Sequence, residues 1–420
     1  MKGFLCKDAV TKMQAILMAV VVVVAAIAGA YYYYVTLTPE HAPSEILVGT
    51  SLSMSGLYAK YGGTYLRAYT MWVSDVNSKG GIYVAEYGKR IPVKLIWYDD
   101  NSDPTTAAKL YEKLITLDNV HIVLSPYSTA IISSVAAICE KYHKVLLATC
   151  CSSDPVYQRG LQYLFNSFLA SKFLTSLAEI VVPKLNPPLK KIAVCNSKTL
   201  YAQIQAQSGK ALLEKAGCET VLYEEWESGI KDFTPLLLRI KSLNVDGLIA
   251  ITTYEEAVLM TRQLIEINWR PKLLYINDAP FFKEYRDTFG NLVEGIVNKY
   301  DVYYANTTEA KDFVKRYTDL YGEYPNEPYC GLEYASCQVL EQAIEKAGTL
   351  NNEKIREVLL ANEFPTIMMT YKFASFGNYT NINIGWVGGT GQIQNGKFIL
   401  IAPPEVKQAD IIYPLSETWT

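Results

Sequence analysis

Short apolar runs alternate with stretches of helical periodicity along most of this 420-residue chain, and the alternating series occurs twice. The first series spans about residues 46–165 and the second about residues 191–277. Strands that alternate with helices form βαβ units, in which parallel strands make a sheet with helices on its faces. We therefore predict an α/β fold with two similar parallel-sheet lobes and a cleft between them, of the kind that closes on a ligand by a hinge motion.

The apolar runs and the periodic stretches predict where the strands and helices lie. Strands are expected at Ile46–Leu52, Val93–Trp97, Val120–Leu124, Val145–Ala148, Ile192–Val194, Thr220–Tyr223, Gly247–Ile251 and Leu273–Ile276. Helices are expected at Tyr65–Asn77, Thr105–Leu117, Ala130–Tyr142, Phe173–Val182, Tyr201–Ala216, Phe233–Leu243, Glu255–Ile267, Glu309–Tyr321, Cys330–Ala347 and Glu353–Ala361. Asp103 and Pro104 predict a helix start, because Asp caps the N-terminus and Pro fits the first helical position. The Asn395-Gly396 pair predicts the turn of a hairpin over Gly391–Ile401.

The N-terminal part of the chain is organised differently. Residues 1–13 carry three lysines against one aspartate, and an uncharged apolar run follows at 14–35. This run has about the 20 residues that a membrane-spanning helix needs, and the basic flank should stay in the cytoplasm. A cleaved secretory signal is the alternative, although its apolar region usually has about 7–15 residues. We expect a membrane anchor, a short linker at 36–44, and an extracytoplasmic remainder.

Two hydroxyl-rich turns each follow an apolar run. Thr129 comes after Val120–Leu124, and Ser152 comes after Val145–Ala148. A helix that starts after such a turn presents unpaired N–H groups beside the hydroxyls, which suits an anion such as a carboxylate. Because neighbouring parallel strands end at the same edge of a sheet, the two turns should converge on one crevice. The pattern predicts a pocket for a small carboxylate-bearing ligand; the competing interpretation is that both hydroxyls only cap helices.

Other kinds of chemistry have little support in the sequence. The formal net charge of −3 does not favour nucleic-acid binding. The eight cysteines form no C-x-x-C pair, and no H-E-x-x-H motif occurs, so we expect no metal site and no cofactor. Neither a phosphate-binding G-x-x-x-x-G-K-[ST] loop nor a G-x-S-x-G nucleophile turn is present. Cys150 and Cys151 resemble a nucleophile pair, but small residues that fill a tight turn are the simpler interpretation.

A series of short motifs runs in a fixed order through the exported part of the chain. The motifs are Met54-Ser55-Gly56, Tyr61-Gly62, Asn77–Ile82, Tyr98-Asp99-Asp100, Asp103-Pro104, Ala148–Ser152, Asp154-Pro155, Gln158-Arg159-Gly160, Lys231-Asp232-Phe233 and Gly295-Ile296. From about Ile46 to Lys397, the chain resembles the type I periplasmic-binding fold, specifically the leucine/isoleucine/valine-binding proteins of ABC importers.

The resemblance implies an architecture and a function. Lobe 1 would comprise residues 45–170 and 302–380, and lobe 2 residues 171–301 and 381–410. The protein would not be an enzyme: it would bind a branched-chain or other amino acid, or a related small polar molecule, outside the cytoplasm. It would then deliver this solute to ABC permease and ATPase subunits. Relatives also bind amides, urea or aromatic acids, which leaves the ligand open.

The resemblance also implies a set of ligand-binding residues. They are Tyr61, Thr129, Cys151, Ser152, Tyr201, Tyr254 and Asp278. Thr129 and Ser152 would bind the α-carboxylate and α-ammonium of the ligand, and Asp278 would pair with the ammonium. Asp278 stands where the family has Glu, so its reach is shorter, and it could instead cap the helix that follows.

The remaining predicted contacts are aromatic or come from the backbone. Tyr61 would form a wall of the pocket, Tyr201 and Tyr254 would cover the ligand from the second lobe, and the backbone of Cys151 would face it. Each of these tyrosines could instead pack in a core or lie on the surface without a role in binding, because the chain contains 32 tyrosines.

Two other functional classes remain in view. The same fold could serve as a membrane-tethered sensory module that reports an amide, urea or aromatic acid to a partner, although only a short segment precedes the predicted anchor. A hydrolase or transferase is the second alternative, and the chain lacks the nucleophile and base motifs that it would need.

Overall fold

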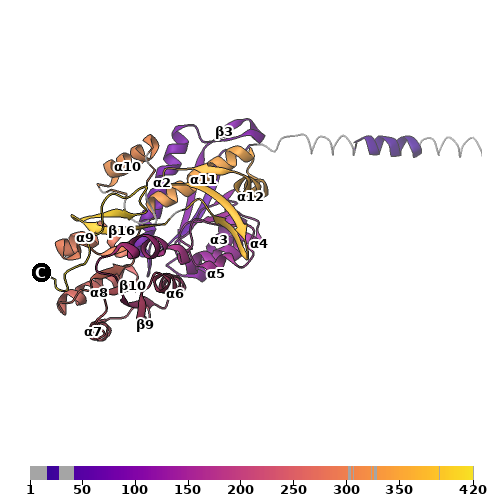
Figure 1. The fold of residues 1–420 in the computed structure, drawn as a ribbon. Coiled ribbons are helices and arrows are strands. Elements are labelled where there is room, and N and C mark those ends of the chain that lie inside the picture. The colour runs from indigo at the N-terminus through magenta and orange to yellow at the C-terminus, as the bar shows by residue number, and fades with distance from the viewer. Residues whose placement is uncertain are drawn as a thin grey trace, which may run out of the picture.

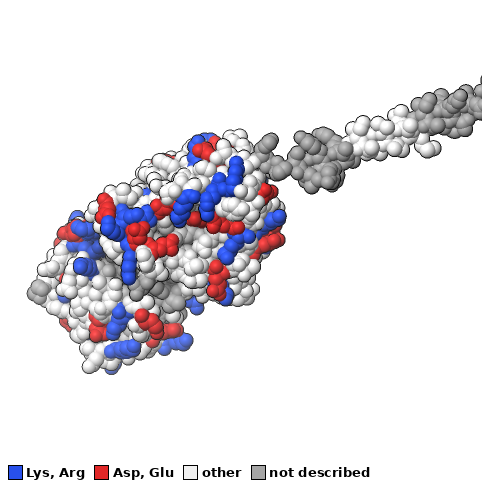
Figure 2. Space-filling model, turned by 90° about the horizontal axis from the view of Figure 1, so that it is seen from above, with Lys and Arg blue, Asp and Glu red and all other residues white. Residues whose placement is uncertain are grey.

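Two lobes, each built around β-sheet, form the body of the protein in the computed structural model (Figure 1). The structure describes residues 17–27, 42–300, 304–305, 307–322, 324–325, 329–386 and 388–419. Helices lie on both faces of the sheets, as βαβ connections require. On the face seen in Figure 2, basic and acidic side chains are interspersed.

The first lobe contains two sheets. One has the order β4-β1-β5, with β1 (Ile46–Leu52) between β4 (Val93–Asp99) and β5 (Ile122–Val123), and all three strands are parallel. The other has the order β13-β14-β15-β7-β6. Its strands are β6 (Leu146–Ala148), β7 (Leu164–Asn166), β13 (Glu363–Pro365), β14 (Thr370–Phe376) and β15 (Tyr379–Asn383). A small antiparallel hairpin, β2 (Ile82–Val84) with β3 (Lys89–Ile91), projects beside them.

The second lobe contains one seven-stranded sheet with the order β17-β16-β12-β11-β10-β8-β9. Its strands are β8 (Lys191–Ser197), β9 (Glu219–Trp226), β10 (Gly247–Ile251), β11 (Leu273–Ile276), β12 (Val297–Tyr300), β16 (Gly389–Gln394) and β17 (Lys397–Ala402). The five strands from β8 to β12 are parallel, whereas the hairpin of β16 and β17 pairs antiparallel with β12.

The helices divide between the lobes in the same way. In the first lobe they are α2 (Ala59–Ser78), α3 (Pro104–Thr116), α4 (Thr129–Lys141), α5 (Asp154–Tyr157), α10 (Thr308–Tyr321), α11 (Cys330–Ala347) and α12 (Asn352–Ala361). In the second lobe they are α6 (Leu200–Lys215), α7 (Thr234–Ser242), α8 (Tyr254–Glu266) and α9 (Lys283–Phe289). In the first lobe, α2 packs against α11 and buries Tyr65, Tyr69 and Trp72 completely or nearly so. Burial of such large side chains supplies most of the driving force for folding.

The predicted α/β fold with parallel-sheet lobes is confirmed, and many of its elements lie close to where they were predicted. The strands β1, β10 and β11 and the helix α11 have the predicted bounds. The predicted start of α3 is also confirmed, because an Asp103 carboxylate oxygen accepts a 2.7 Å hydrogen bond from the backbone N–H of Thr106. Asn395 and Gly396 both have positive φ angles and form the predicted hairpin turn.

The helix predicted at residues 173–182 is found as a helical segment, but its geometry is irregular. The structure has a π-helical stretch, Leu177–Val181, between short 3-10 turns at Ala170–Lys172 and Val182–Lys184. Pro183 has no N–H to donate to the preceding turn, and the chain becomes extended at Leu185, directly after the 3-10 turn that contains this proline.

The predicted membrane anchor is not supported by the structure. Residues 17–27 form a helix with exposed side chains, and the rest of the anchor predicted at 14–35 lies outside the described residues. Among the described residues, no helix has both the length and the apolar character needed to cross a membrane. The predicted basic segment at 1–13 and most of the linker at 36–44 also lie outside the described residues.

Candidate functional site

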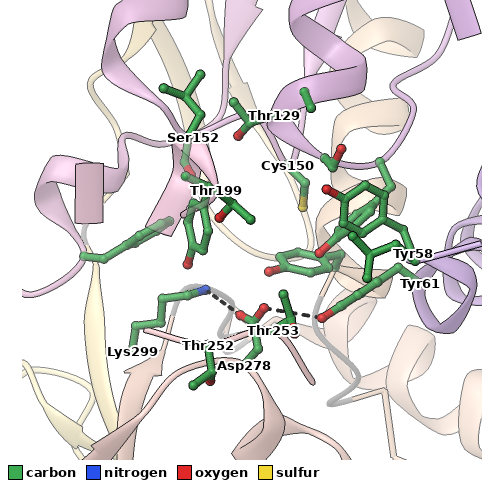
Figure 3. A pocket seen from close by; sticks show the side chains of 18 of the residues that line it. Tyr58, Tyr61, Thr129, Cys150, Ser152, Thr199, Thr252, Thr253, Asp278 and Lys299 are labelled. Carbon is green, nitrogen blue, oxygen red and sulfur yellow. Dashed lines mark hydrogen bonds and ion pairs between the residues drawn. The ribbon is translucent and has the colours of Figure 1, made fainter. Parts of the chain in front are cut away.

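A cavity of about 80 Å³ lies between the two lobes (Figure 3). Its walls come from the segments that follow β6, β8, β10 and β11, together with the first residues of α4, α6 and α8. These are the carboxyl ends of parallel strands and the N-termini of the helices that follow them, the usual place for a ligand in an α/β fold.

The wall contributed by the first lobe offers uncharged hydroxyl groups. Ser128 caps α4, and its hydroxyl oxygen accepts a 3.4 Å hydrogen bond from the backbone N–H of Ile131. Thr129 is the first residue of α4, and Ser152 follows β6; both are buried and line the cavity. Their hydroxyls and the N–H groups at the start of α4 can meet the negative charge of a ligand.

Aromatic rings form a second part of the wall. Tyr61 stacks on Tyr127 with 4.1 Å between the ring centroids, and the Tyr127 ring lies 5.8 Å from that of Tyr329. Burial raises the pKa of the Tyr61 phenol well above its usual value, and the nearby carboxylate of Asp278 raises it further. These phenols are therefore neutral at ordinary pH and act as hydrogen-bond donors beside an apolar surface.

The second lobe contributes hydroxyls at two helix starts. The Thr199 hydroxyl caps α6 by accepting a 3.2 Å hydrogen bond from the N–H of Ala202. Thr253 forms a capping box with Glu256, whose carboxylate accepts a 2.9 Å hydrogen bond from the Thr253 N–H. The Tyr201 hydroxyl accepts a 3.2 Å hydrogen bond from the side-chain amide of Asn277. Local capping by these residues orients the polar groups of this wall.

Asp278 lies at the base of the cavity. It follows β11 with φ +61° and ψ −65°, the geometry of a γ-turn, in which the Ala279 N–H donates a 2.9 Å hydrogen bond to the Asn277 carbonyl oxygen. One carboxylate oxygen accepts a 2.8 Å hydrogen bond from the Asn277 amide, and the other accepts a 3.3 Å bond from the Tyr61 hydroxyl of the opposite lobe. The Tyr61 bond therefore joins the two lobes across the cavity.

Lys299 on β12 is a partner of Asp278 that the sequence analysis missed. Its ammonium nitrogen lies 4.0 Å from an Asp278 oxygen, and its side chain is only 1 % exposed (Figure 3). The ammonium also lies over aromatic rings, 4.6 Å from the centroid of Phe173 and 5.3 Å from that of Phe281. A carboxylate and aromatic faces are the surroundings that let a lysine remain buried. The only hint in the sequence was a lysine within a short segment that forms a strand, β12. The sequence alone does not show whether the Lys299 side chain points into the protein or toward solvent.

Five of the seven predicted site residues line this cavity. They are Tyr61, Thr129, Ser152, Tyr201 and Asp278. Their roles in binding a ligand stay predictions, but the structure brings them together from both lobes. Sequence reasoning did not single out Tyr127 or Tyr329, whose rings complete the aromatic wall, because the chain contains so many tyrosines.

Cys151 and Tyr254 are not among the residues that line the cavity. Cys151 is buried in the core of the first lobe, where its carbonyl oxygen accepts a hydrogen bond from the Tyr157 hydroxyl; its neighbour Cys150 lines the cavity instead. Tyr254 packs edge-on against Phe282 with 4.9 Å between the centroids.

The described residues give little support for nucleophilic chemistry at Cys151 or for a metal site. Burial raises the pKa of the Cys151 thiol to about 12, which leaves it almost entirely protonated at neutral pH. Among the described residues, no group of three or more His, Cys, Asp or Glu side chains is placed to hold a metal ion. The arrangement is suited to holding a small polar molecule.

Comparisons with known proteins agree with this arrangement. Residues 45–381 match the family described as "Periplasmic binding protein". The Leu/Ile/Val-binding protein homolog 7 of Brucella abortus is 24 % identical over 393 residues, which cover 89 % of this chain and 95 % of the relative. A branched-chain amino acid transporter substrate-binding protein of Streptococcus pneumoniae, solved with isoleucine, has a TM-score of 0.72 and 20 % identity over 88 % of this chain and 100 % of its own. A solute-binding protein of R. palustris, solved with benzoate, has a TM-score of 0.71 and 18 % identity over 86 % of this chain and 99 % of its own.

Proposed function

Because this chain belongs to the periplasmic binding protein family, we propose that it captures a small carboxylate-bearing solute between its lobes and delivers it to an ABC importer. The family resemblance predicted from the sequence motifs is confirmed, and with it a solute-binding role. The observation that carries the proposal for the ligand is the cavity itself, in which hydroxyls at helix N-termini of both lobes face one another.

The first lobe supplies the proposed carboxylate site. Thr129 and Ser152 are buried hydroxyl residues, and none of the described first-lobe residues that line the cavity carries a charge. The N-terminus of α4 borders the same space, because the helix begins at Thr129. Hydrogen bonds to a charged group contribute roughly 1.5–3 kcal/mol each, so a few of them bind a carboxylate firmly.

The second lobe closes the site. The Tyr61 hydroxyl donates to Asp278 across the cavity, and the ammonium of Lys60 on α2 pairs with the carboxylate of Glu284 on α9 at the rim. Both contacts join the lobes, and a hinge opening that admits a solute must break them. A solute that contacts both walls would favour the closed arrangement.

The importer and the membrane location are further parts of the proposal. We expect the lobes to lie outside the cytoplasm, tethered by the apolar run at residues 14–35, and to dock on permease subunits with a bound ATPase. Co-purification of permease subunits with the full chain tests the partner. Protease treatment of intact cells tests the location, because digestion of the lobes from outside is expected, and complete protection would contradict it.

A thermal-shift screen of the full chain tests the binding function. The panel contains the twenty amino acids, their 2-hydroxy analogues, aromatic carboxylates, small amides, urea and polyols. A solute at 100 times its dissociation constant should stabilise the folded state by about 2.7 kcal/mol. The shift caused by a carboxylate should fall sharply in Thr129→Val, whereas Thr116→Val, the same change at an exposed position on α3, should leave it unchanged. A panel without a single shift would contradict solute binding.

A further inference from the structure

The base of the cavity already contains both members of an ion pair. Lys299 comes from β12 and Asp278 from the end of β11, and their charged groups lie 4.0 Å apart with 1 % and 7 % of the side chains exposed. The Lys299 ammonium is further surrounded by the rings of Phe173, Phe281 and Tyr329. The pair is therefore a fixed part of the site, because leaving either charge buried alone would be costly.

This pair changes what Asp278 can do for a ligand. A zwitterionic amino acid brings an ammonium group that must find a carboxylate when it leaves water. Asp278 already interacts with Lys299 and accepts hydrogen bonds from Asn277 and Tyr61. Glu255, the other acidic residue on the cavity wall, is exposed and solvated. A ligand ammonium placed here would meet one buried carboxylate and one buried cation, so attraction and repulsion would largely cancel.

Apart from the exposed Glu255, the other described residues that line the cavity are uncharged. The first lobe contributes the hydroxyls of Thr129 and Ser152, and the second lobe those of Thr199, Thr252 and Thr253. Between them lie the rings of Tyr61, Tyr127, Phe168, Phe173, Tyr201 and Tyr329. Such a lining suits a molecule with one carboxylate, an uncharged polar group and an apolar body.

We propose that Lys299 takes the place of the ligand's ammonium group, so that this site selects carboxylic acids that carry no amine, such as 2-hydroxy, 2-oxo or aromatic carboxylates, over the corresponding α-amino acids. This inference rests on the proposed solute-binding function and specifies its substrate class. In the complex, the carboxylate lies at the α4 wall, and the apolar body packs against the aromatic rings above the Asp278–Lys299 pair.

Matched pairs of acids test the inference by isothermal titration calorimetry on the full chain. Leucine is compared with 2-hydroxy-4-methylpentanoate, and phenylalanine with 3-phenyllactate, so that each pair differs only by an ammonium in place of a hydroxyl. We expect the hydroxy acid to bind at least about tenfold more tightly in at least one pair. Equal affinity, or tighter binding of the amino acid, would overturn the inference and leave the solute-binding function intact.

Substitution of Lys299 provides a second test, in which the preference between hydroxy acid and amino acid should change in the opposite direction. Lys299→Met leaves Asp278 available to an external ammonium, so the preference should move toward the amino acid by about tenfold or more. Lys283→Met, which removes an exposed lysine of α9, serves as the control and should preserve the preference of the natural chain. An unchanged preference in a folded Lys299→Met protein would overturn the role of Lys299, and the wild-type comparison decides the question if this variant does not fold.

The same titrations separate this inference from the proposed function. If neither member of any pair binds but an amide or polyol from the thermal-shift panel does, the carboxylic-acid class is wrong and solute binding stands. If nothing in the panel binds, both proposals fail.

Discussion

Two buried carboxyl groups, Asp278 in the second lobe and Glu333 in the first, are handled in opposite ways. Asp278 in the second lobe lies 4.0 Å from the ammonium of Lys299 and forms part of the cavity. Glu333 on α11 in the first lobe is fully buried, and one of its oxygens accepts a 2.6 Å hydrogen bond from the Tyr69 hydroxyl. Its other oxygen has no hydrogen-bond partner within the described structure, and burial raises its pKa to about 8.

The difference shows how a protein keeps or loses a buried charge. A carboxylate in a low-dielectric interior acquires a cation, accepts several hydrogen bonds or binds a proton. The second lobe supplies Lys299, and the resulting ion pair forms a polar floor of the ligand site. The first lobe supplies only neutral hydroxyls, so Glu333 is mostly protonated at neutral pH and belongs to the core behind the site.

Breaking the ion pair should have the largest effect. Asp278→Ala leaves the Lys299 ammonium buried without its carboxylate, and we expect the free energy of unfolding to fall by roughly 3–5 kcal/mol. Urea denaturation measures it. The double variant Asp278→Ala with Lys299→Met should recover part of the loss. Asp287→Ala, which breaks an exposed pair with Lys283, should cost less than about 1 kcal/mol, and an equal cost for both aspartates would contradict the comparison.

The protonated carboxyl in the first lobe should make stability depend on pH. The pKa of Glu333 rises from 4.5 in the unfolded chain to about 8 in the fold, so the folded state binds the extra proton between these values. The contribution of Glu333 to stability should therefore be lost progressively as the pH rises from about 4.5 to about 8, by an amount on the order of 2–4 kcal/mol.

A matched pair of variants isolates this dependence. Glu333→Gln should be more stable than the natural chain near pH 8 and should flatten the decline, measured by urea denaturation across the range. Glu357→Gln, at an exposed position on α12, should reproduce the natural profile. A flat difference between the natural chain and Glu333→Gln would show that the carboxyl is not protonated as we infer.

The interlobe bond from Tyr61 depends on how closely α2 approaches the end of β1. A methyl group on Gly62 would lie 2.2 Å from the carbonyl oxygen of Ser53, whereas one on Gly63 would meet nothing within 4 Å. Gly62→Ala should cost about 1–3 kcal/mol because the helix must shift. Gly63→Ala should be neutral or stabilising by up to about 1 kcal/mol, because Ala favours a helix. Thermal unfolding compares the two, and equal effects would contradict the close approach.

The smallest effect should come from the pair at the rim of the cavity. Lys60 and Glu284 join the lobes, but the Glu284 side chain is 62 % exposed. Glu284→Gln should therefore lower stability by less than about 1 kcal/mol, and the effect should disappear in high salt. A loss as large as that of Asp278→Ala would mean that this exposed contact contributes as much to stability as the buried pair, which would contradict the comparison.

Much of the site was predictable because its residues lie next to strand ends along the chain. Thr129 and Ser152 come within five residues of the ends of apolar runs, and a turn after a parallel strand must lie at the edge of the sheet. Asp278 follows the predicted strand Leu273–Ile276 in the same way, so its position at the cavity was accessible from the sequence. The prediction named Cys151, but its neighbour Cys150 lines the cavity. Successive side chains of an extended segment point to opposite sides, so an error of one residue selects the side chain that points away.

The sequence by itself determined the alternation of strands and helices, the helix caps and the hairpin turn, because these depend on residues that are close along the chain. Only the tertiary structure decided that Lys299 joins Asp278. Lys299 lies on β12, and Asp278 comes two residues after the end of β11. Because β11 and β12 pair, these two groups lie close together although they are 21 positions apart along the chain. The rings of Phe173, Phe281 and Tyr329 help to bury the pair, and these residues come from separate places along the chain, so no local pattern encodes the burial that strengthens the interaction.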